Sequence, residues 1–200
     1  MIGLLLSLSI SVWAGLQASP SGPWCGLDVK RAAAVSCGWK QAAGETAFER
    51  RLSFSVARVP QRWQGLVREQ FSWWERRVPG VRFEEAFVCE DRCLSVSWVP
   101  LQSGIYGYGY YPCYQEPVAG DIQVNVLVDW GRLGNNVLTW LIRHEIGHAL
   151  GLGHSTEQGY LMYPYQARAG MELRVAEQIA LSRLYRVRIR PASPVSGGRP

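Results

Sequence analysis

The chain has 200 residues, which is enough for one globular domain but too few for two well-packed ones. Hydrophobic residues make up 48% and charged residues 18%, a globular composition that excludes a disordered chain. The formal net charge of +5 comes from basic residues that form no block of like charge, so the charge gives no reason to expect a nucleic-acid partner.

The N-terminal region predicts export. Residues 2–13 form an apolar run, which is too short for a bilayer because a span needs about 20 apolar residues. Small residues follow at Ala14 and Ala18, so we interpret residues 1–18 as the signal peptide of a secreted, extracellular or periplasmic protein. A buried N-terminal helix is the alternative, because no Lys or Arg precedes the run. We expect no membrane association after cleavage, since no other segment is apolar enough to span a bilayer.

The rest of the chain divides into a short segment, one domain and a tail. Residues 19–50 predict a loosely ordered, propeptide-like segment, and residues 191–200 predict a disordered tail rich in Pro, Gly and Ser. Within the domain of residues 51–190, the spacing of apolar residues predicts, in chain order, strand 51–57, helix 60–77, strands 81–86, 94–99, 104–111 and 121–128, a helix capped by Asn136 that ends near Leu150, and helix 173–186. This order predicts an α/β (α+β layered) domain with a mixed sheet.

The chain contains five cysteines: Cys25, Cys37, Cys89, Cys93 and Cys113. Cysteines of exported proteins usually pair, and an odd number leaves one thiol over. The three central cysteines can form one bridge among themselves, but the sequence does not fix the pairing.

All three histidines of the chain lie within the segment HEIGHALGLGH. His144 and His148 are one helical turn apart, so both imidazoles project from the same face. Gly151 and Gly153 allow the chain to leave the helix and return His154 as a third ligand. Three neutral imidazoles bind zinc at about 2.0–2.1 Å and leave a fourth position open, as in catalytic sites. The sequence therefore predicts one catalytic zinc ion on these histidines.

Glu145 follows the first histidine and is rotated from it by about 100° around the helix, so it cannot easily bind the same ion. It can instead reach a water on the metal, and zinc lowers the pKa of such a water toward about 7. The carboxylate can take the proton of this water as it attacks a carbonyl, and can later protonate the leaving amine. We therefore interpret Glu145 as the general base and acid of an amide hydrolysis.

HEIGHALGLGH resembles the extended motif HExxHxxGxxH of the metzincin metallopeptidases, which is followed by a Met-turn. Ser155 after the third histidine, and Met162 in the segment LMYP, are similar to the matrixin branch of matrix-metalloproteinase-like enzymes. The resemblance covers residues 51–187, most strongly 144–165. It implies a mixed, mostly parallel, twisted sheet with an active-site helix, a Met-turn at Met162 and a C-terminal helix, in a monomeric, secreted endopeptidase that acts on polypeptides.

The segment YGYGYYP, with Tyr106, Gly107 and Tyr108, resembles the edge strand along which the peptide substrates of the family lie. A plain Gly/Tyr hairpin is the alternative. The resemblance also implies an apolar specificity pocket beside the zinc. Its wall would come from the helix face near Leu141 and from loop 161–165, where Pro164 and Tyr165 are prominent.

The segment PWCGLD resembles the matrixin propeptide switch, in which a cysteine thiolate occupies the fourth position of the zinc and keeps the zymogen latent. Cys25 would be the switch residue, and the odd cysteine count leaves a thiol for this role. The alternative is a Cys25–Cys37 disulfide that closes a small loop. No histidine remains for the second, structural zinc of the vertebrate enzymes, and the family's calcium loops are not evident, so calcium binding is left open.

Two other functions use the same residues. A zinc amidase that acts on cell-wall peptides would share the chemistry, and an inactive secreted module would keep the zinc ligands alone. The Met-turn and the Tyr-rich segment favour a polypeptide substrate, and Glu145 argues against the inactive module.

Overall fold

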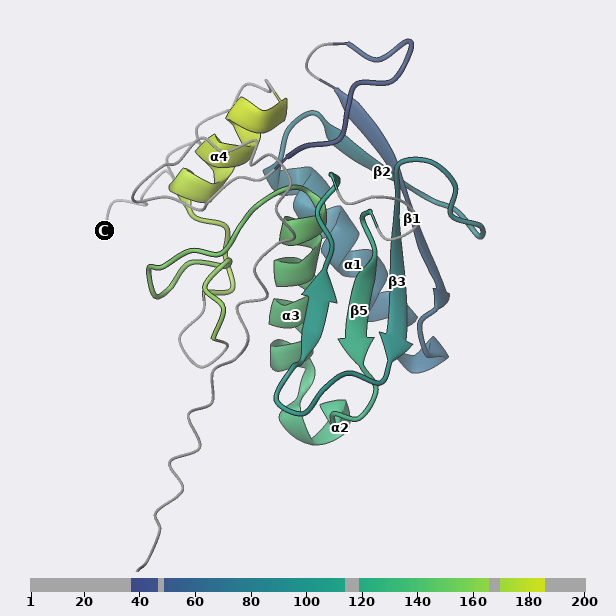
Figure 1. Cartoon of the computed structure of the whole chain (residues 1–200), viewed down its shortest axis with the longest axis vertical. Coiled ribbons are helices and arrows are strands. Elements are labelled where there is room, and N and C mark those ends of the chain that lie inside the picture. Colours follow the sequence, from purple (N-terminus) through teal and green to yellow (C-terminus); the bar gives the residue numbers. More distant parts are fainter. Residues whose placement is uncertain (1–36, 47–48, 114–118, 166–169, 186–200) are drawn as a thin grey trace, which may run out of the picture.

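The computed structural model describes residues 37–46, 49–113, 119–165 and 170–185. The predicted signal peptide, Cys25 and the predicted tail lie outside these residues. In chain order the elements are β1 (Arg50–Arg58), α1 (Gln61–Arg77), β2 (Val81–Glu85), β3 (Cys93–Val99), β4 (Gly107–Gly109), β5 (Ile122–Asn125), α2 (Trp130–Leu133), α3 (Asn135–Ala149) and α4 (Val175–Tyr185) (Figure 1).

The sheet has five strands in the order β2-β1-β3-β5-β4. The pairs β1–β2, β1–β3 and β3–β5 are parallel, whereas β4 runs antiparallel to β5 at one edge. The predicted α/β domain with a mixed, mostly parallel sheet is therefore confirmed. The strand predicted over residues 104–111 is shorter than expected, and so is the strand predicted over 121–128.

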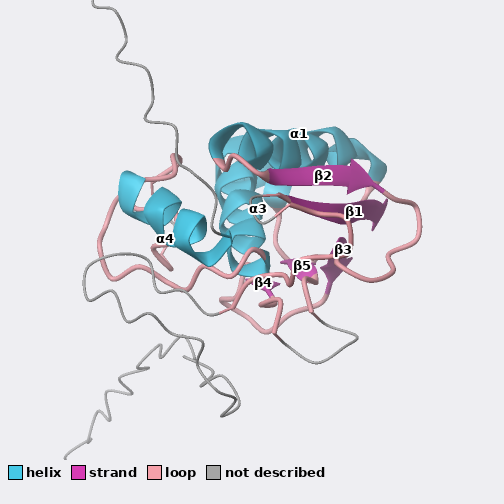
Figure 2. Ribbon diagram, turned by 90° about the horizontal axis from the view of Figure 1, so that it is seen from above, coloured by secondary structure: helices cyan, strands magenta, loops and turns pink. Residues whose placement is uncertain are grey.

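Helices α1 and α3 lie on the same side of the sheet (Figure 2). α1 contacts β1 and β2, α3 contacts β4 and β5, and the two helices contact each other. The core fills the space between them, and its members are buried apolar residues from both layers. One example is the stacked pair Phe54 of β1 and Phe71 of α1, whose ring centroids are 4.1 Å apart. This packing holds α3 rigidly at the β4 edge, where the histidines lie.

Helix α3 begins two residues earlier than an Asn136 cap would give, and Asn136 does not cap it. The N-cap position is held by Gly134 at φ +86°, and no side chain caps the helix there. The reason is the short helix α2 directly before it, which sequence reasoning missed. Asp129 caps α2 by accepting a hydrogen bond from the Arg132 backbone N–H, and Gly134 then reverses the chain between the two helices.

Residues 37–46, which we call the N-terminal strap, pack onto the domain although the sequence predicts a loose segment there. Trp39 is 8% exposed and belongs to the core. Its Nε1–H donates to the carbonyl of Ala149 at the end of α3, 2.9 Å away. The Tyr185 hydroxyl of α4 donates to the next carbonyl, that of Leu150, at 2.7 Å. The strap and α4 therefore both hold the end of the helix that carries the histidines.

Two disulfides lie within the described residues. Cys89 pairs with Cys93, which confirms a bridge among the three central cysteines. Cys37 of the strap pairs with Cys113, which follows β4. The alternative Cys25–Cys37 disulfide is therefore wrong, because the Cys37 sulfur is already bonded.

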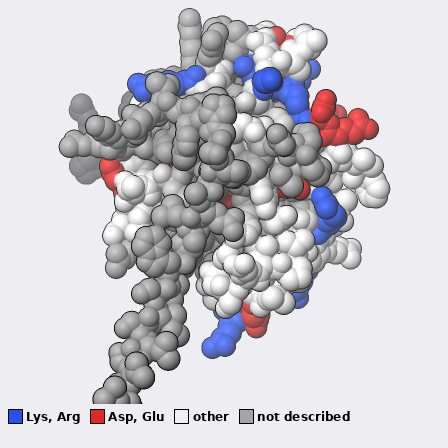
Figure 3. All heavy atoms as spheres, in the orientation of Figure 1, with Lys and Arg blue, Asp and Glu red and all other residues white. Residues whose placement is uncertain are grey.

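None of the helices within the described part of the chain is long and apolar enough to span a membrane. On the face shown in Figure 3, basic and acidic side chains form separate small groups, as expected from a sequence without charge blocks.

Candidate active site

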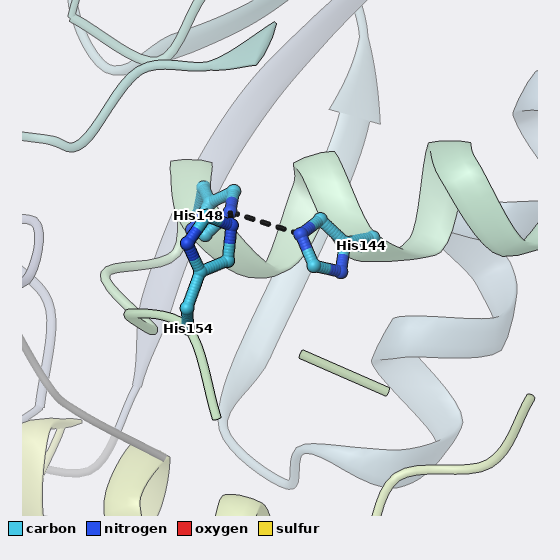
Figure 4. Close-up of side chains that lie close together, drawn as sticks. All are labelled: His144, His148 and His154. Carbon is cyan, nitrogen blue, oxygen red and sulfur yellow. Dashed lines mark hydrogen bonds between the residues drawn. The ribbon is translucent and has the colours of Figure 1, made fainter. Parts of the chain in front are cut away.

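The three histidines come together at the end of α3 (Figure 4). His144 and His148 are 3% and 5% exposed on the last two turns of the helix. The Nε2 atom of His148 lies 3.1 Å from Nε2 of His144 and 3.1 Å from Nε2 of His154. Two ligands at 2.0–2.1 Å from one tetrahedral ion are about 3.3 Å apart, so the spacing fits a shared metal ion.

His154 reaches this position because the chain turns sharply after α3. Gly151 has φ +102°, a conformation that side chains disfavour, and a Cβ at this residue would also overlap the Cys37 carbonyl of the strap. The turn returns the chain toward the helix, as predicted. Gly153 does not share the positive φ, so only the first of the two predicted glycines is required by backbone conformation.

The hydrogen bonds of the imidazoles define which nitrogen carries the proton. His144 Nδ1 lies 2.9 Å from the carbonyl oxygen of Leu161, and His148 Nδ1 lies 2.7 Å from that of Leu152. A carbonyl oxygen only accepts, so both Nδ1 atoms donate and both Nε2 atoms keep bare lone pairs. These lone pairs face each other at 3.1 Å, which is favourable only with a cation between them. The donor set therefore fits a metal ion.

Burial keeps these imidazoles in the neutral form that binds metals. Burial, with the neighbouring His154, lowers the pKa of His144 to about 3. Burial, with both neighbouring imidazoles, holds the pKa of His148 well below its ordinary value. Neutral nitrogen atoms at closely spaced positions form a binding site for zinc without a competing proton.

Glu145 is 5% exposed and lies on the side of α3 that faces β4. A Cβ built on Gly107 would lie 3.3 Å from Glu145 Oε1, so the bare glycine leaves room for the carboxylate between helix and strand. Burial raises the pKa of the Glu145 carboxyl to about 8. A carboxyl group with a raised pKa can both take up and release a proton near neutral pH.

The β4 strand approaches α3 closely because two of its three residues are glycines. Gly107 faces Leu141, and Gly109 faces the Glu145 carbonyl and the Cβ of His148. Tyr108 lies between them in sequence, and its ring is 6.3 Å from that of Tyr110. The predicted edge strand is therefore present beside the histidines, and the alternation of Gly and Tyr reflects one face against the helix.

Met162 is fully buried below the same helix. A Cβ on Gly147 would lie 2.5 Å from its sulfur, so Met162 packs against the residue before His148. Its backbone N–H donates to Glu177 Oε1 of α4 at 2.8 Å. The other oxygen of Glu177 accepts the Arg174 N–H at 2.7 Å, which also caps α4. The turn at Met162 is thus fixed by its packing against α3 and by its hydrogen bond to α4.

The remaining predicted substrate residues occupy different surroundings. The Tyr106 ring packs edge-to-face on Trp130, with centroids 5.6 Å apart. Leu141 is 2% exposed and lies against β4. Pro164 and Tyr165 lie in the loop after Met162, with Tyr165 57% exposed. Their contacts with a substrate stay predictions.

Sequence reasoning missed one aromatic residue at the site. Trp140 is one helical turn before His144, and the two ring centroids are 5.3 Å apart. Its indole N–H is buried without a hydrogen-bond partner among the described residues. The four-residue spacing to the first histidine was the available signal.

The three imidazoles converge beside the buried carboxyl group of Glu145, between the edge strand β4 and the turn at Met162. This arrangement is that of a metzincin-type catalytic domain. The match to known families is specific at this level. Residues 48–186 match the matrixin family of zinc metalloendopeptidases (peptidase M10), and the chain belongs to that family.

Several curated proteins are similar to parts of the chain. Matrix metalloproteinase-B of Caenorhabditis elegans is 35% identical over 72 residues, which cover 32% of this chain and 14% of that protein. Human neutrophil collagenase is 35% identical over 66 residues, covering 32% and 14%. Karilysin of Tannerella forsythia is 25% identical over 137 residues, covering 61% and 28%. The chain thus aligns with between 14% and 28% of the length of these relatives.

Proposed function

We propose that this chain is a secreted, monomeric zinc endopeptidase that hydrolyses polypeptides with Glu145 as general base and acid. The observation that carries the proposal is the pair of bare Nε2 lone pairs on His144 and His148, 3.1 Å apart beside the buried carboxyl of Glu145. Membership of the matrixin family supports the same reading. The two disulfides support export, because disulfides persist mainly outside the reducing cytosol.

His144, His148 and His154 would hold the zinc ion. When bound, zinc acts as a Lewis acid that polarises a carbonyl and makes a water acidic near neutral pH. Glu145 takes the proton of the attacking water and delivers it to the leaving amine. The products are a free carboxylic acid and a free amine. Glu145 gives the amine the same proton that it took from the water, so it ends the reaction in its starting state.

The substrate would bind along β4 by adding a strand to the sheet. β4 pairs with β5 on one side only among the described strands, which leaves its other side for main-chain hydrogen bonds. Tyr106, Gly107 and Tyr108 would line this path. Main-chain hydrogen bonds do not distinguish one substrate sequence from another, so pockets for the substrate side chains supply the selectivity.

The residue after the scissile bond would enter an apolar pocket walled by Pro164 and Tyr165 and by the helix face near Leu141. We expect a medium to large apolar side chain at that position. Profiling of cleavage sites in a peptide library checks this, and a dominant charged residue there would contradict it.

The test of the proposal is chelator-sensitive cleavage of casein by the purified protein, compared between wild type, Glu145→Gln and Glu84→Gln. Glu84 is an exposed residue of β2 and serves as the matched control. We expect cleavage by wild type and Glu84→Gln, and loss of cleavage with retained zinc in Glu145→Gln. Zinc binding without any cleavage would favour an inactive module, and cleavage of cell-wall peptides alone would favour an amidase.

A further inference from the structure

Asn125, the last residue of β5, is 2% exposed, and both polar atoms of its side chain are hydrogen-bonded. Oδ1 accepts the backbone N–H groups of Leu101 and Leu127 at 3.2 and 3.0 Å. Nδ2 donates to the carbonyl oxygen of Ile105 at 2.7 Å and, at the long distance of 3.5 Å, to that of Gln102. Because two N–H groups face one atom and two carbonyl oxygens face the other, only one orientation of the amide satisfies all four partners.

Three of the four partners belong to residues 101–105, which we call the β3–β4 loop because they lie in the connection between those strands. The loop contains a turn of its own, in which the Ile105 N–H donates to the Gln102 carbonyl at 3.2 Å and Gly104 has φ +85°. Such a turn fixes the shape of the loop but not its place against the sheet. Within the described part of the chain, the side-chain hydrogen bonds that attach the loop to the sheet all come from Asn125.

The main chain of Asn125 holds the residue that follows the loop. Its N–H donates to the Tyr106 carbonyl at 2.9 Å, which extends the β4–β5 pairing by one residue. Its carbonyl accepts the indole N–H of Trp130 at 2.9 Å, and the Trp130 ring packs edge-to-face on Tyr106. The contacts of Asn125 therefore fix the chain up to the first residue of β4.

The end of β4 that Asn125 holds lies beside the candidate active site. Gly107 directly follows Tyr106, and a Cβ at Gly107 would lie 3.3 Å from both Glu145 Oε1 and Leu141 Cδ1. A shift of the chain before Gly107 would therefore move the strand relative to the carboxyl group and to the predicted pocket wall.

The direction of β4 relative to α3 shows which part of a substrate this end would meet. Gly107 lies against Leu141, and Gly109 lies against the Cβ of His148, so β4 follows α3 from Leu141 toward His148 and passes Glu145 between them. The proposed pocket for the substrate residue after the scissile bond lies on the Leu141 side. The substrate residues that come after it would accordingly lie along the chain that precedes Gly107.

We propose that Asn125 is a positioning residue, which fixes the β3–β4 loop and the start of β4 and thereby sets the affinity for the part of a peptide that follows the scissile bond. The inference rests on the proposed function. Asn125 lies on the β5 side of β4, whereas the substrate would add to the other side, so Asn125 acts through the strand and not by contact. Loss of its bonds should weaken the binding of long substrates while Glu145 and the metal ligands stay in place.

The experiment compares three variants with wild type. Asn125→Ala removes all four side-chain bonds. Asn125→Asp keeps an acceptor for the Leu101 N–H but places a carboxylate oxygen against the two loop carbonyls, which repel it. Val81→Ala opens a cavity at a fully buried position of β2, at the opposite edge of the sheet from β4, and is the matched control for lost stability.

The readouts are kcat and KM for two peptides and the amide hydrogen exchange of residues 101–106. The peptides are identical up to the residue after the scissile bond. The shorter peptide ends there with an amide group, and the longer peptide continues for several residues.

We expect Asn125→Ala and Asn125→Asp to raise KM for the longer peptide by about tenfold, because a misplaced strand binds that part of the peptide poorly. The kcat of both peptides and the KM of the shorter one should change by less than about twofold, since the groups at the scissile bond are unmoved. The Leu101 N–H should exchange about tenfold faster in Asn125→Ala, which lacks its acceptor. An equal loss of kcat/KM for both peptides, or the same dependence on peptide length in Val81→Ala, would overturn the proposal.

If neither Asn125 variant folds, amide exchange in Glu145→Gln decides, because this variant binds peptides without cleaving them. Saturation with the longer peptide should slow the exchange of residues 101–106, whereas the shorter peptide should leave it unchanged. Equal protection by both peptides, or by neither, would overturn the proposal. A wild-type protein that cleaves neither peptide would overturn the proposed function, and the Leu101 exchange rate in Asn125→Ala would then decide by itself whether Asn125 holds the loop.

Discussion

Gly109 of β4 lies so close to Glu145 that a Cβ atom at this position would overlap the Glu145 carbonyl oxygen and approach the Cβ of His148 to 2.9 Å. The edge strand and the metal-binding helix are thus in backbone contact at the candidate active site. A methyl group here would meet main-chain atoms of α3, and these atoms cannot rotate away as a side chain could.

We expect Gly109→Ala to reduce activity on the order of 100-fold, because β4 must move away from α3 by a fraction of an ångström or more. The free energy of unfolding should fall by about 1–3 kcal/mol. Peptide hydrolysis and denaturant unfolding check this. Gly65→Ala is the control, since no atom lies within 4 Å of its Cβ position in α1, and it should stabilise the protein by about 0.5–1 kcal/mol.

The histidine cluster predicts the metal content. Wild type should carry about one zinc per chain by elemental analysis, and the variant with all three histidines changed to Ala should carry none. Chelation should lower the melting temperature of wild type, because an ion that binds only the folded state stabilises it. A melting temperature of wild type that does not respond to chelator and zinc would contradict a metal site on these residues.

Acid stability should depend on Glu45 of the N-terminal strap. Its carboxylate accepts hydrogen bonds from Arg92 at 2.8 and 3.1 Å and from the backbone N–H groups of Ala42 and Arg51. Burial alone would raise its pKa, but the bonds to Arg92 and to the backbone outweigh burial and hold the pKa at about 2.

Because the folded pKa lies below the unfolded value of 4.5, this stabilisation is complete above pH 4.5 and is lost as the pH falls toward 2. The Glu45 side chain is 5% exposed but its partner Arg92 is 22% exposed, so solvent screening limits this stabilisation to about 1–2 kcal/mol. Denaturant unfolding of wild type and Glu45→Gln should therefore differ by that amount at pH 7 and converge in acid. Glu85→Gln, which removes an exposed pair with Arg68, should differ from wild type by less than about 0.5 kcal/mol.

Latency should depend on Cys25. The Cys37–Cys113 disulfide removes the competing partner, so Cys25 is the one cysteine outside the two disulfides. We expect Cys25→Ser to make the unprocessed protein active and thiol-modifying agents to activate wild type but not the variant. Full activity of unprocessed, unmodified wild type would contradict a cysteine switch.

The parts of the site that are local in sequence could be predicted. The four-residue spacing of His144 and His148 and the glycine at 151 determine the geometry within one helix and one turn, so the three histidines meet as expected. The edge strand was recognisable from its alternation of Gly and Tyr. Its contact with α3 was not, because nothing in the spacing of Gly109 identifies the helix backbone as its neighbour.

Features that depend on distant residues escaped prediction. Trp39 reads as part of a loose polar segment, and its burial follows only from the fold that brings it to the end of α3. Arg143 donates hydrogen bonds to the Gln70 side chain, 73 positions earlier in the sequence, and to the Met171 carbonyl, 28 positions later. The mistaken Asn136 cap has a local cause, since the competing positive-φ glycine at 134 lies just two residues upstream.

The two disulfides differ greatly in the length of chain that they close, and this sets an order for oxidation during biosynthesis. Cys89 and Cys93 are four residues apart and can pair as soon as they emerge, whereas Cys113, the observed partner of Cys37, lies 76 residues after it and emerges long after Cys25. Early closure of the short loop removes the thiols of Cys89 and Cys93 as competing partners. Cys37 can then pair with either Cys25 or Cys113. Recombinant production in an oxidising compartment with a disulfide isomerase should accordingly give a homogeneous product. Cytosolic expression followed by air oxidation should instead trap the Cys25–Cys37 isomer. In that isomer Cys113 is left unbridged, and the strap is no longer tied to the chain beyond β4.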